Sequence, residues 1–213
     1  MVTAPCRPAA AVLLPCLMFL LIALVPAGPL SAQEREAVGQ VVQQRGVVTA
    51  LRTTAARSLH LGAPVFPGDQ VITAAQAKVE IEFDDGSTLS VGAGTTVEVV
   101  NYAPAARRPG RLLLLIGIIR TSISELWSGG FEVRTRAAVA SVRSTDWVTE
   151  ARDDRSSVFV VEGAVEVTAE PGGESVLLSA GDGTDVPVGG APSSPVQWGA
   201  ARVQDVLERT RVP

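Results

Sequence analysis

Histidine and cysteine, two of the side chains most used in acid-base and nucleophilic chemistry, are scarce in this chain, and His60 is its only histidine. A Ser-His-acid triad would have to use His60, and no Gly-x-Ser-x-Gly turn leads from a strand into a helix. Both cysteines, Cys6 and Cys16, lie in an apolar N-terminal segment. The rest of the chain therefore has no thiol nucleophile, disulfide or cysteine metal site.

Clustered carboxylates could serve a glycosidase or bind calcium, and the richest run contains Glu80, Glu82, Asp84 and Asp85. Glu80 and Glu82 alternate with apolar residues, which is the pattern of the solvent-facing side of a strand. The segment 181–185 matches part of a calcium-binding nonapeptide, but such sites need stacked copies and the chain has a single one. No phosphate-binding or dinucleotide-binding loop is present. We therefore predict a protein that is not an enzyme, with no catalytic residue, cofactor or metal.

The N-terminal segment has the order of a secretory signal. Arg7 precedes an uncharged apolar run from about Ala9 to Val25, and Ala32 supplies a small residue before a cut at Gln33. An uncleaved anchor is the alternative, since about 20 helical residues cross a bilayer. We predict that residues 1–32 are removed and that the protein is periplasmic or secreted.

The formal net charge is −4, and the leader contains one basic residue, Arg7, and no acidic one. An acidic exported domain disfavours nucleic acid as a partner, and membrane contact is expected only if the leader stays uncut. Aromatic residues make up 4% of the chain, too few for an obvious glycan-binding platform. Trp127, followed by Ser-Gly-Gly, is the best candidate for a partner contact, although we favour a core or edge position for it.

Residues beyond the leader form short β-type runs separated by glycine turns. Residues 79–83 and 88–91 alternate in polarity around Asp85-Gly86, as in a β-hairpin. Many such runs predict an all-β domain over residues 33–190, either solenoid-like or a compact two-layer structure. Residues 191–213 are predicted to form a linker and a C-terminal helix over 195–211, which would cap an open end or edge of the β domain.

The order of these turns resembles the FecR family of periplasmic domains. Its patterns G-D-x-I-x-T, F-x-D-G-S, V-R-G-T, E-G-x-V-x-V and L-x-A-G are similar to segments that occur here in the same order. The matching residues, expected to be structural, are Gly68, Asp69, Asp85, Gly86, Arg143, Thr145, Gly163 and Gly181. Ser144 departs from the pattern, because the family usually has glycine there, so a modified turn is expected. Arg143 could bond turn carbonyls or pair with Asp146.

Members of this family sense an outer-membrane transporter and pass its state to a sigma factor. The resemblance therefore implies a non-enzymatic binding module in envelope signalling or scaffolding, with a protein or an envelope polymer as partner. Two alternatives stay open: a membrane-anchored transmembrane regulator that keeps its N-terminal helix, and an enzyme that acts on cell-wall glycan.

Overall fold

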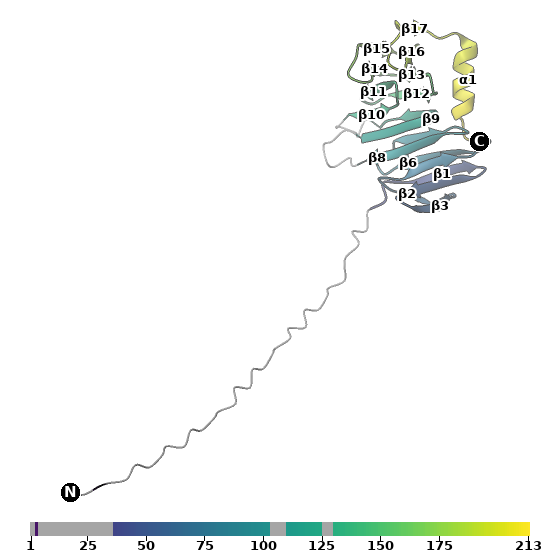
Figure 1. Cartoon of the computed structure of the whole chain (residues 1–213). Helices are drawn as coiled ribbons and strands as arrows, with labels where there is room; N and C mark the ends of the chain where they lie inside the picture. The colour runs from purple at the N-terminus through teal and green to yellow at the C-terminus, as the bar shows by residue number, and fades with distance from the viewer. Residues whose placement is uncertain (1–2, 4–35, 103–109, 125–129) are drawn as a thin grey trace. The chain divides into compact units, whose positions relative to one another are not determined.

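The computed structural model describes residue 3 and residues 36–102, 110–124 and 130–213. The chain divides into two units, residues 1–34 and 35–213, and every strand and the helix of the described residues belong to the second (Figure 1). The predicted cleavage site and Trp127 lie outside the described residues.

The β-strands form two layers, which we call sheet A and sheet B. In sheet A the hydrogen-bonded order is β4 (Pro64–Val65), β1 (Gly39–Arg45), β6 (Lys78–Phe83), β7 (Thr88–Val91), β9 (Gly110–Ser122), β12 (Asp146–Ala151), β13 (Arg155–Glu162), β16 (Asp182–Pro187) and β17 (Val196–Gln197). All these pairings are antiparallel. Such hairpin-rich pairing suits strands joined by short glycine turns.

Sheet B has the order β3 (Ala55–Leu59), β2 (Val48–Arg52), β5 (Gln70–Thr73), β8 (Thr96–Asn101), β9, β10 (Phe131–Arg134), β11 (Ala138–Val142), β14 (Ala164–Ala169) and β15 (Ser175–Ser179). Its one parallel pairing among the described residues joins β9 and β10. The two sheets are layers of one open sheet because β9 belongs to both.

Strand β9 passes from one layer to the other at Gly117, whose φ is +101°. Residues 110–116 pair in sheet B, and residues 117–122 pair in sheet A. A Cβ at position 117 would lie 2.6 Å from the Cα of Thr95. Glycine is therefore required here both for the backbone conformation and for the close approach of a second strand.

The core lies between the layers and is built from the alternate, inward-facing side chains of each strand. A row of aromatic rings passes through it. Phe83 and Tyr102 stack with ring centroids 3.7 Å apart, and Phe131 meets Tyr102 and Trp147 edge-on at 5.9 and 6.1 Å. The predicted all-β architecture, in its two-layer form, is confirmed.

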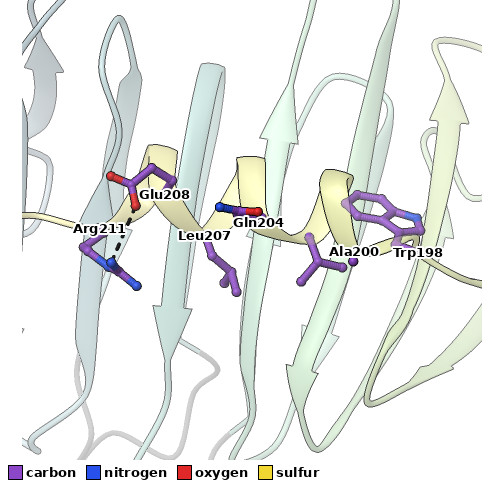
Figure 2. A pocket seen from close by; sticks show the side chains of 7 residues that line it. Trp198, Ala200, Gln204, Leu207, Glu208 and Arg211 are labelled. Carbon is purple, nitrogen blue, oxygen red and sulfur yellow. Dashed lines mark ion pairs between the residues drawn. The ribbon is translucent and has the colours of Figure 1, made fainter.

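The predicted C-terminal helix is also confirmed, as α1 (Ala200–Thr210). It crosses the outer face of sheet A, whereas the sequence suggested an end or edge (Figure 2). The reason is an apolar patch on that face, formed by Ile118, Val148 and Phe159, which Val206 of the helix covers. No helix within 36–102, 110–124 and 130–213 is long and apolar enough to cross a membrane.

Candidate interaction site

The first family motif forms a corner held by the buried carboxylate of Asp69, whose side chain is fully buried. Arg57 donates two hydrogen bonds to it, at 3.0 and 2.6 Å, and the backbone N–H of Phe66 donates a third at 2.8 Å. Gly68 has a φ of +86° and precedes it at the turn. Through Asp69, this Gly-Asp turn thus connects β3 to the start of β5.

The second motif is a turn in which Asp85 accepts hydrogen bonds from the backbone N–H and the hydroxyl of Ser87, at 3.0 and 2.9 Å. Tyr102 also donates its hydroxyl to Asp85, at 2.7 Å. Gly86 has a φ of +81°, as a tight corner between β6 and β7 requires. The carboxylate of Asp85 therefore organises the corner.

The third motif joins two neighbouring turns through Thr145, whose hydroxyl lies near the carbonyls of Arg143 and Ala164, at 3.0 and 3.1 Å. Ser144 has a φ of +49°, so serine occupies a left-handed position where the family pattern has glycine. Gly163, with a φ of +88°, packs so closely that a Cβ would lie 3.0 Å from the Thr145 hydroxyl oxygen.

Arg143 is exposed, and within the described part of the chain its guanidinium makes no hydrogen bond or ion pair. The suggested partner, Asp146, instead receives two hydrogen bonds from Arg120, at 2.9 and 2.6 Å. The pairing of Arg143 with Asp146 was therefore wrong. Arg120 on the adjacent strand β9 lies opposite Val148 in the register, and its guanidinium binds Asp146 diagonally, two residues along β12.

The carboxylates weighed as metal or catalytic groups do not converge. Glu80 accepts a hydrogen bond from Ser90 at 3.3 Å, Glu82 is exposed on the same strand, and Asp185 is paired to Arg202. Among the described residues no group of three potential metal ligands forms. His60 is exposed and follows the end of β3.

A hollow of about 510 Å³ follows one flank of α1. Figure 2 shows its side chains arranged along the helix, with Trp198 at the start and Arg211 at the end. Leu207 belongs to the half-buried apolar floor, and Glu208 and Arg211 form an ion pair at 3.6 Å on the rim. The lining residues are Trp198, Ala200, Val203, Gln204, Leu207, Glu208 and Arg211.

The start of the helix is anchored by Trp198. Its ring stacks on Phe159 with centroids 5.1 Å apart, and the Arg202 guanidinium lies 3.5 Å above it. A Cβ on Gly183 would collide with the Trp198 ring, so glycine in β16 makes room for it. The hollow is therefore built on a helix whose first turn is held in place.

Polar contacts fix the rest of α1. Arg202 donates to Asp185 at 3.1 and 2.6 Å, and Arg209 donates to Glu150 at 2.7 Å. Burial alone would raise the pKa of Asp185, but hydrogen bonds from Arg202 and Ser157 hold that pKa below its ordinary value. Asp185 lies on β16 and Glu150 on β12, so two strands of sheet A hold the helix in place. The hollow beside the helix is therefore a preformed surface.

Sequence reasoning found the carboxylates of the corners but missed their partners. Arg57 and Tyr102 lie 12 and 17 residues from the aspartates that they bond. Contacts between residues this far apart leave no recognisable pattern in the local sequence. The anchoring role of Trp198, which is half-buried and lies two residues before α1, was also missed.

The described part of the chain is therefore a two-layer β domain with a helix across one face. Residues 69–166 match the family model described as "FecR protein". The resemblance drawn from the motifs is thus confirmed, and this stretch is a FecR domain. No curated protein matches the chain.

Two solved structures share this fold, and both are titled as a "putative anti-sigma factor from Parabacteroides distasonis". Each has a TM-score of 0.55, with 20% and 19% sequence identity, and each comparison covers 65% of this chain. The chain matches 64% and 63% of the length of those proteins, respectively. At this identity the likeness shows a common fold.

Proposed function

We propose that this protein is an exported, non-enzymatic binding module that regulates envelope signalling by contacting another protein. The observation that carries the proposal is the FecR domain at residues 69–166, on a fold shared with proteins titled as anti-sigma factors. Four carboxylates make contacts that hold the fold together, and none of these contacts assembles a catalytic group; this supports a binding role over an enzymatic one. The four are Asp69, Asp85, Asp146 and Asp185.

The surface best suited to a partner is the hollow along α1. It offers apolar side chains, Val203 and Leu207, beside a charged pair, Glu208 and Arg211, which is the composition of a contact with an apolar core and a polar rim. The fixed helix keeps the ordering cost of binding small. We propose that an apolar segment of an envelope protein binds in this hollow.

Two neighbouring alanines of α1 give a matched test of this surface. Ala200 lines the hollow, whereas Ala201 is exposed on the same helical turn and is not among its lining residues. Ala200→Trp should block the partner, and Ala201→Trp should not. Captured envelope proteins are compared between the two variants and the unchanged chain. Equal capture by all three would exclude the hollow, and retention on purified cell-wall polymer alone would favour a polymer ligand.

Export is tested by the N-terminus of the native protein. A first residue near Gln33 in the periplasmic or culture fraction supports the exported module. A protein that keeps residues 1–32 and stays with the inner membrane supports the anchored regulator instead.

A further inference from the structure

The free edges of the two sheets differ in how they are protected against pairing with another strand. Sheet A ends in β4 and β17, which have two residues each. Beside β17, the edge of β16 is covered further along, because Asp185 and Ser193 exchange hydrogen bonds at 3.1 and 2.9 Å. Short and covered edge strands resist pairing.

Sheet B ends in β3 and β15. Strand β3 carries Arg57 at its centre, and a charge on an edge strand also discourages pairing. Strand β15, with the sequence Ser-Val-Leu-Leu-Ser, has no charge and no proline. Its pairing with β14 has a continuous register without a bulge, and within the described residues β15 pairs with no other strand.

The register shows which backbone groups of β15 face outward. Ala169 donates its N–H to the carbonyl of Glu174 at 3.0 Å, so these two residues form a hydrogen-bonded pair. Hydrogen-bonded and non-bonded pairs alternate along an antiparallel ladder. Ser175, Leu177 and Ser179 therefore direct their N–H and C=O groups away from β14, to the open edge.

Leu177 stands at the middle of this edge with 66% of its surface exposed. The N–H of Ser179 already donates to the carboxylate of Asp182 at 3.0 Å. The backbone groups of Ser175 and Leu177, and the carbonyl of Ser179, face the edge with no partner strand in the described part of the chain.

We propose that β15 is a self-association edge, which pairs antiparallel with β15 of a second copy of this chain about a two-fold axis at Leu177. The Leu177 residues of the two copies face each other and exchange both of their backbone hydrogen bonds. Ser175 of each copy donates to the Ser179 carbonyl of the other. Sheet B thereby continues from one copy into the next.

The second copy fits this edge because the strand is complementary to itself. In the two-fold register, Ser175 faces Ser179, and Glu174 faces Ala180, so no two like charges are opposed. Opposed Leu177 side chains form an apolar cross-strand pair on the outer face of sheet B. Such self-matching is what a two-fold contact requires.

Cysteine cross-linking tests the register, in the full chain with Cys6→Ala and Cys16→Ala so that no native thiol remains. Directly opposed residues of a hydrogen-bonded pair have Cα atoms about 5.5 Å apart, which a disulfide can bridge. Leu177→Cys should therefore form a covalent dimer under mild oxidation. Ser175→Cys alone should not, because its own copies lie about 13 Å apart along the strand.

A mixture of the Ser175→Cys and Ser179→Cys variants should cross-link, since these positions are opposed. Leu61→Cys is the control for random collision, because Leu61 is 68% exposed and lies in the turn between β3 and β4. Cross-linking of Leu177→Cys no faster than that of Leu61→Cys would overturn the proposal, as would a Ser175→Cys dimer formed as readily as the mixture.

Sedimentation equilibrium gives a second readout without oxidation. The unchanged chain should associate to a dimer, and Leu177→Lys should weaken that association by at least about tenfold, because it opposes two cations. Mixing the Leu177→Lys and Leu177→Glu variants should restore it, and Leu61→Lys should have no effect. A monomer at every concentration of the unchanged chain would refute the proposal. Because no partner protein takes part, either outcome leaves the proposed contact at α1 unaffected.

Discussion

Tyr102 donates its hydroxyl to the carboxylate of Asp85 across 2.7 Å, while its ring stacks on Phe83. One side chain thus joins the end of β8 to the corner between β6 and β7. The same carboxylate accepts two hydrogen bonds from Ser87, whose hydroxyl oxygen accepts the N–H of Ser124 at 3.0 Å. The family motif at this corner is therefore coupled to the aromatic core.

Tyr102→Phe should keep the stacked ring and remove the hydrogen bond. A bond to a charged group contributes about 1.5 to 3 kcal/mol, so the free energy of unfolding should fall by about that amount. Urea unfolding of Tyr102→Phe, Asp85→Asn and the double variant measures the coupling between the two residues. If the effects of the two single variants simply add, the proposed link between corner and core is wrong.

Tyr102 is the only tyrosine of the chain, so its ionisation can be followed directly. Burial, as the largest cause, raises the pKa of Tyr102 far above its ordinary value of 10.0. The protonated phenol is thus favoured in the folded state, and this contribution to stability is complete below pH 10 and is lost as the pH rises further. Tyrosinate absorbance should appear together with unfolding. Ionisation in the folded protein near pH 10 would contradict the buried position.

Asp69→Asn should destabilise the protein by about 3 kcal/mol or more, because it leaves Arg57 without its charged partner at a buried corner. The control is Asp154→Asn, since Asp154 is 70% exposed and pairs with Arg155 at 3.3 Å. An exposed pair of this kind contributes about 0 to 1 kcal/mol. Thermal unfolding compares the two variants, and similar melting temperatures would show that the corner is not held by Asp69.

Ser144→Gly should stabilise the protein by about 0.5 to 1 kcal/mol, because glycine adopts the positive φ of this turn without steric cost. The control, Ser141→Gly, lies in the extended strand β11, where glycine should destabilise by a similar amount. Urea unfolding measures whether each substitution raises or lowers the free energy of unfolding. A loss of stability in Ser144→Gly would mean that the serine side chain makes a contact worth more than the backbone strain.

The corners and the fold class could be predicted because their signals are local. Gly68, Gly86, Gly163 and Gly181 all have positive φ, as their places in turn sequences suggested. The alternation of residues 79–83 and 88–91 likewise gave the hairpin β6–β7. Local patterns of this kind also sufficed for the all-β class and the C-terminal helix.

Features that depend on contacts between distant segments could not be predicted in this way. The position of α1 depends on Trp198, whose ring stacks on Phe159 and packs against Gly183. Both of these residues precede Trp198 in the sequence by many positions. The bond of Arg120 to Asp146 likewise follows from the register of β9 and β12, which the sequence does not reveal. The hollow along α1 exists because these contacts hold the helix across a face of sheet A.

Photo-cross-linking in intact producing cells tests the binding role most directly. A photoreactive residue replaces Gln204, which lines the hollow, or Ala201, which is exposed on the same helix and is not among the lining residues. Binding at the hollow predicts one discrete adduct with an envelope protein from position 204, and none from position 201. The absence of any protein adduct at position 204, or the same adducts from both positions, would contradict it.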